Sequence, residues 1–167
     1  MEDIVRFIHE AGSLKLVPRS GWLKLGIKLP ESVAEHSFRT ALIAFILALK
    51  NGEGLEVACK AATAALFHDL HESRTMDLHK IAQRYVIANE KKAKEDQLSW
   101  MEFEPDFSEV EDYVDDADKL ELAFQAVEYA DQATYALKLA EKVELKTEIA
   151  KEIYQALMVR KNPVWWR

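Results

Sequence analysis

The residues of this chain best suited to metal chemistry are histidines and carboxylates spread over three separate stretches. His68 is followed directly by Asp69, and Glu72 adds a carboxylate four positions after that histidine. His36 lies thirty-two positions upstream, and Asp118 lies far downstream in a second acidic stretch. Two imidazoles and two carboxylates form a mixed nitrogen and oxygen set, which suits a six-coordinate divalent ion such as Mn, Fe, Co or Ni. Zn is a weaker fit because it prefers four ligands.

Each of these residues also has an ordinary structural interpretation. His36 alone could be a hydrogen-bonded core histidine, and the His68–Asp69 pair could place a histidine at a helix C-terminus, where the dipole favours it. Asp118 alone could be a solvated helix residue. The combination favours a metal site, because an aspartate at the end of an apolar helix is costly to bury unless it is paired or metal-bound. Glu35, Asp115 and Asp116 are weaker ligand candidates.

The order H…HD…D over three helical segments resembles the signature of the HD-domain metal-dependent phosphohydrolases. The resemblance implies an all-α fold, a compact helical HD-domain bundle in a single domain. It also implies that His36, His68, Asp69 and Asp118 bind one divalent metal ion. The HD phosphodiesterases with two metal ions need further histidines after the HD pair, and His71 and His79 are the only spare ones here. His71 could contact the substrate or be a plain loop residue.

A narrower resemblance connects the chain to the 5'-deoxynucleotidase branch of that superfamily. Glu72 is followed five positions later by Asp77, and Arg19 and Trp22 precede His36. The resemblance spans about Arg19 to Asp118 and implies hydrolysis of 5'-nucleotides, deoxyribonucleoside 5'-monophosphates in particular, to nucleoside and phosphate. Two positions depart from the pattern: Met76 stands where the branch usually has Gly, and His79-Lys80 follow Asp77 where it tends to have Pro.

The resemblance also implies roles for the four residues that are not metal ligands. Arg19 would bind the phosphate, since a guanidinium is permanently charged and can bind it in a bidentate way. Trp22 would pack against the sugar and leave no room for a ribose 2'-hydroxyl. Glu72 and Asp77 would act on the attacking water and on the sugar or departing O5', in an order that sequence does not decide.

These four residues have structural alternatives as well. Arg19 could be a surface residue, with Lys24, Lys28 and Arg39 as the next candidates for binding phosphate. Trp22 could instead be a hydrophobic anchor that holds its loop to the core. Glu72 and Asp77 could merely cap a loop.

Length, composition and charge limit the classes of protein to which the chain can belong. With 167 residues, 49% of them hydrophobic and 31% charged, the chain suits one globular domain. We expect residues 1–167 to form a single HD domain, with the metal-site core at about 19–120 and C-terminal helices at 121–160. The net charge of −7 argues against a general nucleic-acid binder, which needs a basic face. A small phosphorylated substrate remains compatible with it, because a bound metal inverts the local potential.

Two further features predict the location of the protein. The acidic N-terminus is not followed by the apolar segment of a signal peptide, and the longest apolar run, Ala41 to Leu49, is far too short to cross a bilayer. Cys59 is the only cysteine, so we expect no internal disulfide and a buried thiol. We therefore expect a cytoplasmic, soluble protein without a membrane or nucleic-acid partner.

Apolar residues recur at intervals of three and four along most of the chain, and only five glycines and four prolines interrupt them. The pattern predicts helices at about 3–11, 33–49, 55–68, 78–101, 108–141 and 145–160, with an irregular stretch at 12–30. Ser32-Val33-Ala34-Glu35 is a capping box that marks the start of the second helix. The resemblance and the terminal pair Trp165-Trp166 favour a homodimer; alternatively, the tail folds back onto its own domain.

Two other classes of function stay open at this stage. The first is a non-catalytic nucleotide-binding regulator that keeps the HD pocket for recognition. The second is an interaction module whose helical surface is its purpose. The complete ligand set argues against both.

Overall fold

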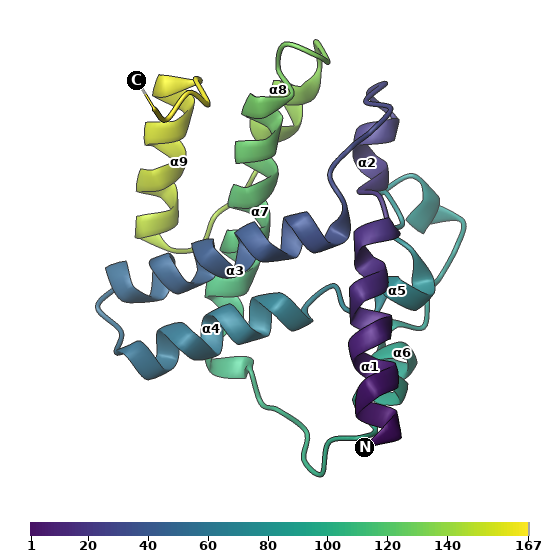
Figure 1. Ribbon diagram of the computed structural model, residues 1–167. Helices are drawn as coiled ribbons and strands as arrows, with labels where there is room; N and C mark the ends of the chain where they lie inside the picture. Colours follow the sequence, from purple (N-terminus) through teal and green to yellow (C-terminus); the bar gives the residue numbers. More distant parts are fainter. Residues whose placement is uncertain (167) are drawn as a thin grey trace. The chain divides into compact units, whose positions relative to one another are not determined.

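The computed structural model describes residues 1–166, and that part of the chain is helical with no β-strand (Figure 1). The all-α prediction is therefore confirmed. Pro18 and Ser32 form an isolated antiparallel bridge. In chain order the elements are α1 (Glu2–Gly12), η1 (Ser13–Leu16), α2 (Ser20–Leu23), α3 (Val33–Lys50), α4 (Leu55–Phe67), α5 (Glu72–Thr75), η2 (Ala82–Arg84), α6 (Glu90–Leu98), η3 (Ser108–Val110), α7 (Glu111–Glu128), α8 (Ala136–Ala140) and α9 (Glu148–Arg160).

The chain divides into two compact units. The first unit comprises residues 1–38 and 67–106, and the second comprises residues 39–66 and the chain from 107 onward. The three boundaries in the sequence fall within α3 after Phe38, at the end of α4 after Leu66, and before η3 after Asp106. The expected extent of a single domain over the whole chain stays a prediction.

The first unit has a small apolar core, to which the segment before α3 contributes side chains. Leu14, Val17, Val33 and Leu70 are buried in it. Phe7 of α1 packs against this core, and its ring also lies 5.1 Å from that of Trp100. Burial of large apolar side chains is the main source of stability in such a cluster. Through Phe7, this core packs α1 against the segment that follows the His68–Asp69 pair.

The second unit has a core made largely of small residues. Ala44 and Ala48 of α3 and Ala58, Ala61 and Ala65 of α4 are buried in one cluster, which also takes in residues of α7 and α9. Leu47 and Leu120 are the largest apolar side chains that are fully buried there. Small side chains let helix backbones approach closely, which agrees with the Ala-rich sequence of α4.

The predicted capping box at the start of α3 is confirmed. The Ser32 backbone N–H and hydroxyl both donate to the Glu35 carboxylate, at 2.7 and 2.8 Å, and the Glu35 N–H donates to the Ser32 hydroxyl at 3.2 Å. These bonds satisfy backbone donors that a helix start would otherwise leave unpaired. They fix the first turn of α3, which carries His36.

Two predicted helices are shorter than the spacing indicated. The helix expected at 78–101 is represented only by η2 and by α6, which begins after Asn89; the Asn89 side chain accepts the Lys92 N–H. Gln83 to Ile87 are exposed, and a segment without a buried face lacks the packing that stabilises most helices. The helix expected at 108–141 ends with α7 at Glu128, and the short α8 follows.

Three smaller expectations have clear outcomes. Cys59 is exposed, not buried, because α4 turns Ala58 and Ala61 toward the core instead. Trp165 and Trp166 pack edge to face against each other and are 80% and 66% exposed, so neither of these two rings is buried against the domain. Within the described residues, no helix is long and apolar enough to cross a membrane.

Candidate metal and phosphate site

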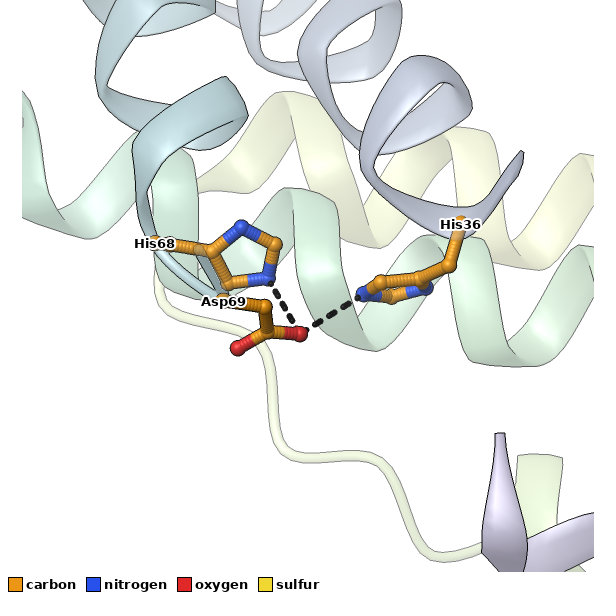
Figure 2. A group of neighbouring side chains, drawn as sticks. All are labelled: His36, His68 and Asp69. Atoms are coloured by element: carbon orange, nitrogen blue, oxygen red, sulfur yellow. Dashed lines mark ion pairs between the residues drawn. The ribbon is translucent and has the colours of Figure 1, made fainter. Parts of the chain in front are cut away.

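Three of the four predicted metal ligands meet in the first unit. His36 comes from the first turn of α3, while His68 and Asp69 follow directly after the end of α4. The Asp69 Oδ2 atom lies 3.5 Å from His36 Nε2 and 3.1 Å from His68 Nε2 (Figure 2). The two imidazole rings face the same oxygen from different segments, with centroids 5.4 Å apart. One potential ligand atom from each residue lies within 4.8 Å of the others, close enough to share one ion.

The environment of this trio favours a charged carboxylate. His36 is fully buried, and the side chain of Asp69 is 15% exposed. Burial raises the pKa of the Asp69 carboxyl, but hydrogen bonds from His36 and His68 and the charge of Arg19 hold that pKa well below its usual range. An ionised carboxylate beside two imidazoles is a donor set that a first-row divalent ion accepts. The residues present therefore fit a metal ion of that kind.

The fourth predicted ligand, Asp118, lies half-buried on α7 in the second unit. Its role as a ligand stays a prediction. The weaker candidate Asp116 is fully buried, and its carboxylate accepts the N–H groups of Lys146 and Thr147 at 2.8 and 2.7 Å. Asp116 thus holds the start of α9.

The two other weaker candidates also have structural partners. Glu35 is exposed, and its capping hydrogen bonds to Ser32 lower the pKa of its carboxyl. Asp115 pairs with Lys146 at 2.8 Å. Both carboxylates therefore have partners of their own, apart from the His36, His68 and Asp69 trio.

Arg19 lies beside the trio, as the sequence predicted for a phosphate-binding residue. Its Nη1 atom is 3.3 Å from Asp69 Oδ2 and 3.9 Å from Asp77 Oδ2, and its side chain is 18% exposed. Of the alternatives, Lys24 and Lys28 are exposed on the surface. Arg39 is engaged in the second unit by Glu121 at 2.7 Å and Glu128 at 2.6 Å. Arg19 is therefore the cation that accompanies Asp69.

Glu72 is a buried acid whose pKa is shifted in the opposite direction from that of Asp69. The helix α4 ends at Phe67, so Glu72 is not one turn along the same helix from His68; it begins α5 instead. Burial, and then the charges of Asp69 and Asp77, raise the pKa of Glu72 to about 8, although Arg19 and His36 oppose them. Its Oε2 atom is buried and has no hydrogen-bond partner among the described residues. A carboxyl group of this kind carries a proton near neutral pH and could donate it.

Asp77 occupies a different environment from Glu72. Its Oδ2 atom accepts the backbone N–H of Ser20 at 2.8 Å, and its side chain is 11% exposed. The preceding residue, Met76, has φ 63° and ψ 159°, a combination that is essentially restricted to glycine. The departure noted in the sequence, Met76 where the branch has Gly, therefore falls at a position whose backbone favours glycine.

Trp22 is 2% exposed, and its indole N–H donates to Glu31 Oε1 at 3.0 Å. This burial favours the interpretation of Trp22 as an anchor that holds the loop to the core. Its contact with a sugar stays a prediction. Sequence reasoning did not single out Glu31, whose position directly before the capping box was the only available signal.

Comparisons with known proteins show which family the chain is similar to. A family model described as HD domain matches residues 11–99. The chain is 33% identical to 5'-deoxynucleotidase HDDC2 of Dictyostelium discoideum, and the match covers 88% of this chain and 86% of that protein. The human protein of the same name is 29% identical over 77% of this chain and 69% of its own length.

Solved structures are more similar still. One crystal structure from a genomics project is 75% identical and covers all of both chains, with a TM-score of 0.98. A predicted coding region from Archaeoglobus fulgidus is 68% identical, covers 99% of this chain and 100% of its own, and has a TM-score of 0.86.

Proposed function

The chain belongs to the HD-domain family, and from this membership and the site around Asp69 we propose that it hydrolyses deoxyribonucleoside 5'-monophosphates to nucleoside and phosphate. It is a phosphohydrolase that acts on the 5'-phosphate of nucleotides. The observation that supports the proposal most directly is that His36, His68 and Asp69 converge while Arg19 lies against the same carboxylate. The deoxyribose preference rests on the names of the relatives.

The metal site would consist of His36, His68, Asp69 and Asp118. A bound divalent ion lowers the pKa of a water ligand and neutralises charge on the phosphate. Mn, Co, Fe or Ni suits the mixed donor set better than Zn. Analysis of the metal content of the purified protein tests this choice.

The protein's own residues would supply positioning and charge, which is most of what phosphoryl transfer requires. Arg19 would bind the phosphate oxygens through its guanidinium group. In the reaction water adds to phosphorus while the bond from phosphorus to O5' breaks, so O5' must gain a proton. Glu72 is buried, its neighbours raise the pKa of its carboxyl, and its Oε2 atom has no hydrogen-bond partner among the described residues, so we propose that it supplies this proton.

Two alternatives from the sequence receive less support. A non-catalytic nucleotide-binding regulator and an interaction module would not need a buried acid beside an arginine. The curated relatives are named as enzymes. Phosphate release by the purified protein would exclude both alternatives.

The test is a panel of ribo- and deoxyribonucleoside 5'-monophosphates assayed for phosphate release, with Asp69→Asn as the matched inactive variant. This substitution keeps the shape of the side chain and removes its charge, so we expect a folded, helical protein without turnover and with most of its metal lost. A variant that keeps its metal and near-normal turnover would exclude Asp69 as a ligand and contradict the proposed site.

We also propose that the protein is a cytoplasmic homodimer. From Ala41 to Leu49 the helix α3 has only apolar side chains, and Leu42, Ile46 and Leu49 remain 49%, 44% and 40% exposed. An exposed apolar row on a helix usually has a protein partner. No charged residue lies between Ala41 and Leu49, so two copies can meet there without burying a charge.

The homodimer is tested by light scattering. The parent should have twice the chain mass, and Ile46→Glu should give monomers, whereas Glu152→Lys on the exposed side of α9 should not change the mass. A monomeric parent would contradict the homodimer.

A further inference from the structure

The short segment that carries Arg19 is bound on two sides by backbone hydrogen bonds. On one side, the Arg19 N–H donates to the Glu31 carbonyl at 2.9 Å, and the Val33 N–H donates to the Val17 carbonyl at 2.8 Å. These bonds tie the segment to the start of α3. Arg19 itself is extended, with φ −66° and ψ 96°, and α2 begins at the next residue.

On the other side, Ser20 ties the same segment to the loop after α5. Its backbone N–H donates to Asp77 Oδ2 at 2.8 Å, and its hydroxyl accepts the His79 N–H at 3.1 Å. A hydrogen bond from N–H to a carboxylate is stronger than one between neutral groups. Ser20 and Asp77 are 57 positions apart in the sequence, so this contact fixes two distant segments relative to each other.

We propose that Ser20 and Asp77 are a positioning pair for Arg19. Asp77 binds the residue after Arg19 through Ser20 and lies 3.9 Å from the Arg19 guanidinium. The first contact fixes the backbone beside Arg19, and the second restricts the rotamers of its long side chain, whose freedom would otherwise be lost only when phosphate binds. The inference rests on the proposed function, in which Arg19 binds the phosphate.

This assignment separates the roles of the two acids near Asp69. The Oδ2 atom of Asp77 is an acceptor in a bond to the protein's own backbone. Through this bond Asp77 holds the residue that follows Arg19, whereas the Oε2 atom of Glu72 is buried without a partner among the described residues.

The test uses Ser20→Pro, because proline lacks the N–H that donates to Asp77. Ser20 is the first residue of α2, where proline is tolerated, and Arg19 already has the extended backbone that a residue before proline requires. Ser20→Ala is the matched control, since it removes the hydroxyl and keeps the N–H. Each variant is combined with Arg19→Ala, and inorganic phosphate is titrated calorimetrically into the metal-loaded proteins.

If the pair acts through Arg19, Ser20→Pro binds phosphate about tenfold or more weakly than Ser20→Ala in the parent background. In the Arg19→Ala background the two should differ by less than twofold, because the residue being positioned is gone. Equal binding by the two variants in the parent background, or the same loss in both backgrounds, would overturn the proposal.

Asp77→Ala gives a second and independent measurement if Ser20→Pro does not fold. It should also weaken phosphate binding only while Arg19 is present. A loss of equal size with Arg19→Ala would show that Asp77 acts directly on the ligand and would overturn the proposal. Because phosphate binding needs no turnover, absence of nucleotide hydrolysis by the parent would count against the proposed function alone.

Discussion

Replacing Glu72 by glutamine should change how the stability of the metal-free protein depends on pH. The folded protein raises the pKa of Glu72 from 4.5 to about 8, first through burial and then through the charges of Asp69 and Asp77. Between these two pH values the folded protein holds a proton that the unfolded chain releases. The contribution of protonated Glu72 to stability is therefore fully present below about pH 4.5 and is lost as pH rises through about 8.

The magnitude follows from linkage. One proton taken up on folding changes the free energy of unfolding by at most about 1.4 kcal/mol per pH unit. Glutamine cannot titrate, so the free energy of unfolding of the parent minus that of Glu72→Gln should fall steadily from pH 5 to pH 8. Several kcal/mol of difference could accumulate over that window by this slope.

The assay is urea unfolding followed by circular dichroism, in buffers that contain a chelator, at four pH values from 5 to 8. Glu152→Gln, an exposed substitution on α9, controls for the general change in charge. A difference between the parent and Glu72→Gln that stays constant, or that rises with pH, would refute the reasoning that burial and the neighbouring carboxylates keep Glu72 protonated.

Three further predictions concern neighbouring residues. Arg19→Ala should keep its metal content and lower kcat/KM on nucleotides at least about tenfold, since a charge-assisted contact contributes roughly 1.5–3 kcal/mol; activity within twofold of the parent would place phosphate binding elsewhere. Trp22→Ala should lower the free energy of unfolding by about 3–5 kcal/mol, because a buried aromatic is deleted. The ratio of dAMP to AMP hydrolysis, compared between the parent and Trp22→Ala, tests the predicted contact of Trp22 with the sugar. An unchanged ratio excludes that contact. Met76→Gly should be more stable than Met76→Ala by about 1 kcal/mol in urea unfolding, because only glycine adopts its backbone conformation without strain. At an exposed helix position such as Lys91, the alanine variant is normally more stable than the glycine variant. If Met76→Ala is likewise more stable than Met76→Gly, the backbone of Met76 is not strained.

The parts of the fold that sequence could predict are those with local causes. The capping box at Ser32 fixes the start of α3 within four residues, and the His68–Asp69 pair falls directly after α4, close to where the apolar spacing ended that helix. The association of these residues with Arg19 came from the resemblance to a family, because no spacing rule connects positions fifty residues apart.

The errors also have physical causes. Residues 78–89 have helical spacing but no buried face, and η2 and a loop form there instead of the expected helix. No glycine or proline marks the break between α7 and α8, so no local signal predicts it. The contact of Ser20 with Asp77 was also beyond prediction, because it depends on the packing of two loops and not on either sequence alone.

The formal charges of the site suggest the order in which its ligands bind. In the first unit, the carboxylates of Asp69 and Asp77 both lie beside the guanidinium of Arg19, the group that would bind phosphate. Carboxylates at this position favour a cation and oppose an anion. A divalent metal raises the charge of the site by two, whether or not Asp118 joins its ligands, and so makes the site attractive to phosphate. Inorganic phosphate should therefore bind at least about tenfold more tightly to the metal-loaded protein than to the chelated protein in a calorimetric titration at pH 7. Equal affinity in both would mean that Arg19 alone determines phosphate binding, and that the negative charges around it have little influence on the site.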